Sequence, residues 1–182
     1  MTGGRRAVVF DHLVRRRSPR RRAPLDFGRG RQAGAAPVNG RVHNDYTEAS
    51  GRRRLALVLG NEAAQDVHHF CILNFWRPLM EPVLDAPLAL CDARTVSALD
   101  MVAGEVRYPH RTGDIYLVRH SPGHRWYFYS AMRRSEVLVF KQYDTRLNGV
   151  PRFTPHCAFE LPVTAPVPPR ESIELRCLVI LE

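Results

Sequence analysis

The sequence predicts a mainly β fold, a sandwich or jelly roll of the cupin type with a few short helices. About eight short runs rich in Val, Ile, Leu, Phe and Tyr follow one another from residue 41 onward. Clusters of Gly, Pro, Asp and Asn separate these runs. Helical periodicity is weak, and many short strands with turn signals between them are typical of an all-β sandwich or barrel.

The first expected strand is AVVFDHLV, residues 7–14. The later runs, in chain order, are RVHNDY, RRLALVLG, HHFCILNFWRPL, PLALCDA, DIYLVRHS, RWYFYSA, EVLVFKQYD and SIELRCLVIL. Their β-branched and aromatic residues fit a half-buried pleated surface. Two other segments, 60–69 and 94–103, predict short helices, with Asn61 and Thr95 as N-caps.

The chain of 182 residues is long enough for one domain with a real core. Its net charge of +9 is uneven, because residues 1–54 hold 14 arginines and only four acidic residues. Residues 15–40 are rich in Arg, Gly, Pro and Ala and show no periodicity. We therefore expect residues 1–40 to be a basic, partly disordered N-terminal segment with one short strand, and residues 41–182 to be the folded domain.

Several classes of protein do not match this composition. No zinc-finger, helix-turn-helix or RNP motif accompanies the arginines, so nucleic acid is not an expected partner. No apolar run approaches the roughly 20 residues that cross a bilayer, and the N-terminus lacks the apolar core of a secretory signal. The four cysteines include no C-x-x-C pair, which argues against a zinc knuckle. Free, buried thiols in a reducing cytoplasm are the simplest interpretation.

The segment VHNDY carries His43 and Asp45, two positions apart. Side chains alternate between the faces of a strand, so this imidazole and this carboxylate project together. They make up two thirds of the 2-His-1-carboxylate triad that holds Fe(II) and leaves coordination positions open. Because an isolated H-x-D pair is a weak signal, the prediction needs a third ligand.

Residues 153–176, FTPHCAFELPVTAPVPPRESIELR, supply the missing parts. His156 precedes a Pro-rich connection, and Arg170 opens the last strand with Ser172 on the same face. An arginine fork binds a carboxylate through parallel hydrogen bonds, and a serine hydroxyl adds another. The ordered set H-x-D, H and R-x-S therefore predicts a metal site with an anchor for 2-oxoglutarate, as in a double-stranded β-helix oxygenase.

His124, in SPGHRWYFY, is the alternative third ligand. No R-x-S follows it at a comparable distance, so we favour His156, which makes His124 a pocket residue or a core histidine. Asn74 and Arg77 of NFWRPL and Tyr127 of RWYFY are candidate substrate contacts. A buried strand that ends in a Pro turn explains NFWRPL nearly as well, and RWYFY is more often aromatic core packing than a substrate contact.

Several blocks together resemble a family of natural-product oxygenases. The blocks are VHNDYTEASG, NFWRPL, PLALCDART, YLVRHSPGHRWYFYSAM, EVLVFKQYDT and PRESIELR. The family contains the cephalosporin 7α-hydroxylase component of cephamycin methoxylation and fungal hydroxylase/desaturases, and the resemblance runs from about residue 7 to the C-terminus. Its members have additional sequence before the first strand, and the Arg-rich stretch 15–31 departs from their pattern. We therefore expect the chain to be shortened at its N-terminus.

The resemblance implies a non-heme iron, 2-oxoglutarate-dependent oxygenase. In this family His43, Asp45 and His156 would hold Fe(II), and Arg170 with Ser172 would anchor 2-oxoglutarate. The implied partners are O2 and a small-molecule secondary metabolite, and the implied reaction is hydrogen abstraction leading to hydroxylation or desaturation. A catalytically inactive, truncated relative that acts as a β-barrel binding protein is the alternative.

Overall fold

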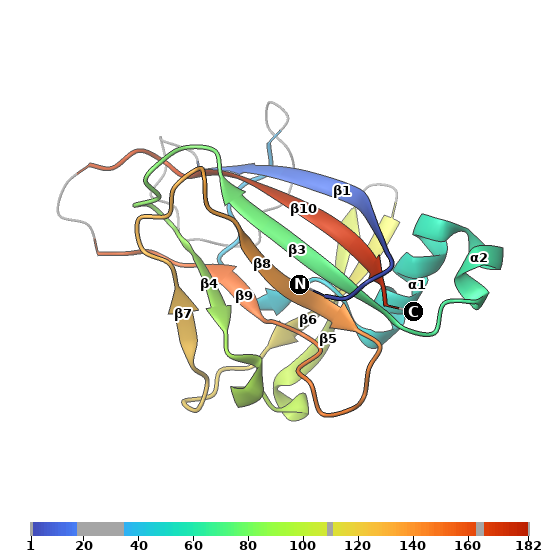
Figure 1. Ribbon diagram of the computed structural model, residues 1–182. Helices are drawn as coiled ribbons and strands as arrows, with labels where there is room; N and C mark the ends of the chain where they lie inside the picture. Colours follow the sequence, from blue (N-terminus) through green and yellow to red (C-terminus); the bar gives the residue numbers. More distant parts are fainter. Residues whose placement is uncertain (1, 18–34, 109–110, 163–165, 182) are drawn as a thin grey trace.

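The computed structural model describes residues 2–17, 35–108, 111–162 and 166–181. The described residues form two antiparallel sheets that face each other (Figure 1). The first sheet has the strand order β1 (Arg6–Arg16), β10 (Glu171–Ile180), β3 (Phe70–Pro78) and β8 (Leu138–Asp144). The second has the order β5 (Met101–Tyr108), β6 (Arg111–Val118), β2 (His43–Asn44), β9 (His156–Ala158), β4 (Leu88–Cys91) and β7 (Trp126–Phe128). Because strands dominate and the chain passes repeatedly between the sheets, the mainly β prediction is confirmed.

The inner face of the first sheet is apolar at both ends and polar in the middle. Along β3, Phe70 and Ile72 belong to one buried cluster and Trp76 belongs to another, and the fully buried Asn74 lies between them. Residues i and i+2 of a strand share a face, so this order follows from the sequence F-x-I-x-N-x-W. A buried polar band therefore crosses the interior between two hydrophobic clusters.

Each cluster joins the first sheet to another part of the chain. The cluster around Phe70 includes Leu55 from helix α1 (Glu48–Leu59), and the cluster around Trp76 includes Leu88 from β4. Burial of such side chains stabilises the fold by about 25 cal/mol per Å² of apolar area. The two clusters thereby hold the polar band in place from both sides.

Helix α1 (Glu48–Leu59) and the short helix α2 (Asn61–Gln65) lie at one end of the sandwich, on the right in Figure 1. The strand predicted for RRLALVLG is wrong, because all of these residues except the final Gly60, the C-cap, belong to α1. Thr47 caps the helix in a capping box with Ser50, and Leu55, Val58 and Leu59 recur at helical spacing against the core. The short helix predicted within 60–69 is confirmed as α2, although Gly60, and not Asn61, is its N-cap.

The helix predicted for 94–103 is also wrong. Two short 3-10 turns, Ala93–Thr95 and Ala98–Asp100, precede strand β5 there. Thr95 is not a cap, since Asp92 and Ser97 cap the two turns. β5 pairs with β6 over its whole length, so tertiary pairing supplies backbone hydrogen bonds that a helix would otherwise make.

The remaining predicted strands are confirmed with shifted ends, and the run RVHNDY contributes only the two-residue strand β2. The aperiodic segment is residues 15–40, and residues 18–34 of it lie outside the described residues. In the described part of the chain, the helices fall short of the length and apolarity that a bilayer crossing requires.

Candidate metal centre

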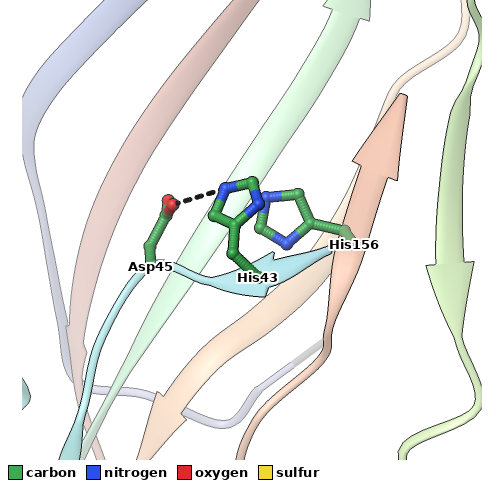
Figure 2. Close-up of side chains that lie close together, drawn as sticks. All are labelled: His43, Asp45 and His156. Atoms are coloured by element: carbon green, nitrogen blue, oxygen red, sulfur yellow. Dashed lines mark ion pairs between the residues drawn. The ribbon is translucent and has the colours of Figure 1, made fainter. Parts of the chain in front are cut away.

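His43, Asp45 and His156 gather between the sheets, and their potential ligand atoms all lie within 4.8 Å of one another. β2 pairs with β9 so that His43 is directly opposite His156, and their ring centroids are 4.4 Å apart. Asp45 lies just beyond the end of β2, and its side chain turns to the same side (Figure 2). The structure thus joins the predicted H-x-D pair to the distal histidine.

Backbone carbonyls orient both rings. Nδ1 of His43 lies 2.7 Å from the carbonyl oxygen of Arg41, and Nδ1 of His156 lies 3.2 Å from that of Thr154. A carbonyl oxygen can only accept a hydrogen bond, so these two shorter contacts assign the ring proton to Nδ1 in each histidine. Nε2 of each ring is then the nitrogen that can bind a metal ion.

The two carboxylate oxygens of Asp45 have different surroundings. Oδ1 lies 3.4 Å from Nε2 of His43 (Figure 2, dashed line). Oδ2 accepts hydrogen bonds from Nδ2 of Asn74 at 2.9 Å and from Nε of Arg176 at 3.1 Å. Burial alone would raise the pKa of Asp45, but the buried charge of Arg176 beside it holds this pKa well below its usual range. Asp45 is therefore an anionic oxygen donor at ordinary pH.

Gln142 links the two segments that carry the cluster. Its buried side chain accepts a hydrogen bond from the backbone N–H of Asp45 through Oε1 at 2.8 Å. Its Nε2 donates to the carbonyl oxygen of Thr154 at 3.2 Å. Because these bonds satisfy a buried amide on both ends, Gln142 fixes the distance between the strand ends that bear Asp45 and His156.

The donor set fits a divalent transition metal ion. Burial, together with repulsion from His43, lowers the pKa of His156 to about 3, so its imidazole is neutral and ready to bind. Two imidazoles and one carboxylate are ligands of Fe(II) in open facial sites and also suit Zn(II). A cation between Nε2 of His43 and Oδ1 of Asp45 would stabilise two acceptor atoms that otherwise face each other.

A second group of buried polar atoms surrounds Arg170. This residue is 2% exposed, and its guanidinium donates to the carbonyl oxygen of Ala86 and lies over the ring of Trp76. Within the described residues, Nε of Arg170, Oγ of Ser172 and Nε1 of Trp76 have no hydrogen-bond partner. Burial lowers the pKa of Arg170 to about 9, since a cation is costly in the interior. These unsatisfied donors fit the carboxylate of an acidic ligand.

The other predicted site residues do not join either group, except for Asn74, which contacts Asp45. Nε of Arg77 bonds the carbonyl oxygen of Arg134 on the exposed side of β3. Tyr127 is 58% exposed on the edge strand β7. Nε2 of His124 lies 3.0 Å from Oδ2 of Asp100, so this histidine pairs with a carboxylate outside the cluster.

The sequence reasoning missed Arg176, Gln142 and Trp76. A signal for Arg176 was present, because Arg170, Ser172, Glu174 and Arg176 occupy alternate positions of the last strand. Four polar residues on one face of a buried strand require partners. Gln142 and Trp76 carry no comparable local signal, since each is a single residue of a core strand.

Comparisons with known proteins place the chain among oxidoreductases. Residues 1–180 match the family described as Oxidoreductase/YMDC permease-like domain. The Fe(II)/2-oxoglutarate-dependent dioxygenase nvfI of Aspergillus novofumigatus is 39% identical over 142 residues, which are 76% of this chain and 51% of the relative. The hydroxylase/desaturase efuI of Hormonema carpetanum is 38% identical over 160 residues, which are 81% of this chain and 53% of the relative.

A solved structure shows the same fold. The iron and alpha-ketoglutarate-dependent endoperoxidase NvfI superposes with a TM-score of 0.84 at 31% sequence identity, covering 98% of this chain and 63% of that chain. The fold is therefore the double-stranded β-helix expected from the sequence. The chain spans about half the length of the two curated relatives that it matches.

Proposed function

Because the chain belongs to the Oxidoreductase/YMDC permease-like domain family, we propose that it is a Fe(II)- and 2-oxoglutarate-dependent oxygenase. Its substrate would be a small-molecule secondary metabolite, and the reaction would be hydrogen abstraction leading to hydroxylation or desaturation. The observation that carries this proposal is the convergence of His43, Asp45 and His156 within 4.8 Å. The names of the two fungal relatives support the same chemistry.

His43 and His156 would hold the metal through Nε2, with the Nδ1 protons fixed on backbone carbonyls. Asp45 would bind through Oδ1, because its Oδ2 is already engaged by Asn74 and Arg176. The three protein ligands would leave other coordination positions open for a cosubstrate and O2. Bound iron with 2-oxoglutarate supplies the oxidising power, and the protein supplies positioning.

Arg170 and Ser172 would anchor the distal carboxylate of 2-oxoglutarate. The buried, unsatisfied donors of these residues would gain an anionic partner, which offsets the cost of their burial. Phe140, whose ring lies edge-on to His156 at 5.0 Å, belongs to the same apolar cluster as Trp76. This cluster would exclude water from the space between anchor and metal.

We further propose a cytoplasmic location. All four cysteines are free and buried, as expected of thiols in a reducing compartment.

The test is iron binding and 2-oxoglutarate turnover by the purified chain. Anaerobic titration should give one bound Fe(II) per chain in the wild type, with succinate formed once O2 is admitted. His43→Ala, Asp45→Ala and His156→Ala should each lose iron while retaining the far-ultraviolet circular dichroism of the β fold.

His124→Ala is the matched control, because it removes a buried histidine that lies outside the cluster. It should keep its iron. Equal iron contents in the wild type and all four variants would contradict the assignment. Loss of iron in His43→Ala, Asp45→Ala and His124→Ala, but not in His156→Ala, would make His124 the third ligand. A chain that binds iron and 2-oxoglutarate without forming succinate would be a binding protein and not an oxygenase.

A further inference from the structure

Arg176 is the centre of a partly buried ionic network that reaches the candidate metal centre. Its Nη1 lies 2.8 Å from Oδ2 of Asp11 on β1, and its Nη2 lies 2.8 Å from Oε1 of Glu174. Its Nε donates to Oδ2 of Asp45 at 3.1 Å. Since three carboxylates hold one guanidinium from different sides, Arg176 has little freedom to move away from Asp45.

Asn74 is a second donor to the same oxygen. β10 pairs with β3 so that Arg176 is directly opposite Asn74, and their side chains share the inner face of the sheet. Asn74 is 0% exposed, and its Nδ2 donates to Oδ2 of Asp45 at 2.9 Å. Two neighbouring strands thus direct two hydrogen-bond donors at one carboxylate oxygen.

We propose that Arg176 and Asn74 are positioning residues that restrict Asp45 to binding the metal through a single oxygen, Oδ1. This inference rests on the proposed function. An Asp carboxylate that is free to rotate can bind a cation through both oxygens and occupy a second coordination position. With Oδ2 held by two donors, that position stays open for the cosubstrate or O2.

This role differs from the substrate contact that the sequence suggested for Asn74. Within the described residues, its remaining polar atom, Oδ1, has no hydrogen-bond partner. Its amide donor is directed at the carboxylate of Asp45. Outer-shell partners of this kind orient metal ligands, and their loss typically weakens metal binding by about 10- to 100-fold.

A cavity beside the network makes the proposal testable by chemical rescue. A pocket of about 470 Å³ opens between β1, α1 and β6, and both Asp45 and Arg176 line its wall. Truncation of Arg176 to alanine would extend this pocket to Oδ2 of Asp45. A guanidinium ion is small enough to enter it and to replace the missing donors.

The experiment measures Co(II) binding by the full chain, because Co(II) takes the same ligands as Fe(II) and its d–d absorption reports coordination. Asn74→Leu removes a donor at similar volume, and Arg176→Ala removes the other. We expect each to weaken Co(II) binding by about 10- to 100-fold and to alter the d–d spectrum. In Arg176→Ala, guanidinium chloride at tens of millimolar should restore both the Co(II) affinity and the d–d spectrum. Sodium chloride at equal concentration should restore neither.

Arg54→Ala is the matched control, since Arg54 lines the same pocket but its guanidinium stacks on Phe10. It should bind Co(II) like the wild type. If Asn74→Leu and Arg176→Ala also bind like the wild type, the inference is wrong. It is also wrong if both bind weakly with an unaltered spectrum and without guanidinium rescue, because the network would then be only structural.

The outcomes separate this inference from the function on which it rests. A wild-type chain that binds no Co(II) would overturn the proposed function and the inference together. Variants that match a wild type with bound Co(II) overturn the inference alone.

Discussion

His43 and His156 lie directly opposite each other on paired strands, with ring centroids 4.4 Å apart. They come from distant parts of the sequence, and the pairing of β2 with β9 brings them together. Both rings donate Nδ1–H to a backbone carbonyl two residues earlier. The sheet itself therefore sets the spacing and the orientation of the candidate metal ligands.

Arg170→Met should weaken 2-oxoglutarate binding by about 10-fold or more, because a charge-assisted hydrogen bond is worth about 1.5–3 kcal/mol. Methionine keeps much of the apolar stem, so the packing against Trp76 persists. The measurement is calorimetric titration of 2-oxoglutarate into the Co(II)-loaded chain. Arg77→Met, which changes an exposed arginine of β3, is the control. Equal affinities for the two variants would exclude Arg170 as the anchor.

Gly51→Ala should destabilise the fold by about 1–3 kcal/mol through overpacking. A Cβ at Gly51 would lie 2.5 Å from Cδ2 of Tyr143, whose ring is fully buried. Urea unfolding followed by fluorescence gives the loss of stability. Gly123→Ala serves for comparison, since a Cβ there meets only Oγ of Ser121 at 3.6 Å and should cost little. Similar unfolding midpoints for both variants would contradict the packing argument.

Thr47→Ala should lower the free energy of unfolding by about 1 kcal/mol. Oγ1 of Thr47 accepts a hydrogen bond from the backbone N–H of Ser50 at 3.1 Å, and this bond starts helix α1. The loss should appear in urea unfolding as a shifted midpoint with an unchanged slope. Thr47→Ser keeps the acceptor oxygen and should recover most of the stability. A serine variant as unstable as the alanine variant would show that the cap is not the cause.

At acid pH, protonation of Asp144 should lower the free energy of unfolding. Its fully buried carboxylate accepts hydrogen bonds from Nζ of Lys141 at 2.6 Å and Nη2 of Arg146 at 2.8 Å. Burial opposes ionisation, but these two cations lower the pKa of Asp144 to about 2. Because the pKa is lower in the folded state, the ion pairs contribute fully above the unfolded pKa of about 4. Their contribution is then lost as the pH falls from about 4 toward 2.

Asp144→Asn isolates that contribution. Because Lys141 and Arg146 are partly exposed, the ion pairs contribute on the order of 1 kcal/mol to the free energy of unfolding. Between pH 4 and pH 2, urea unfolding of the wild type should lose more stability than that of Asp144→Asn. Parallel losses in the two proteins would assign the acid sensitivity to other groups.

Much of the fold could be predicted from local pattern. Alternating apolar residues marked most strands, including β3, β8 and β10, because the side-chain period of a strand is a property of a few consecutive residues. The same rule put His43 with Asp45, and Arg170 with Ser172, on shared faces. The expectations for RRLALVLG and for 94–103 failed where helical and strand patterns overlap in short apolar runs. There the capping box of α1 and the pairing of β5 with β6 decided the outcome.

What the sequence by itself determined is the mainly β class, the H-x-D pair and the R-x-S motif, since each depends on neighbouring residues. Only the tertiary structure decided which histidine lies beside Asp45, because that depends on the pairing of strands far apart in the chain. His156 faces His43 across β2 and β9, whereas His124 pairs with Asp100 elsewhere. The same long-range pairing turned Asn74 and Arg176 toward Asp45, since a side chain's face is local but its partner across the sandwich is not.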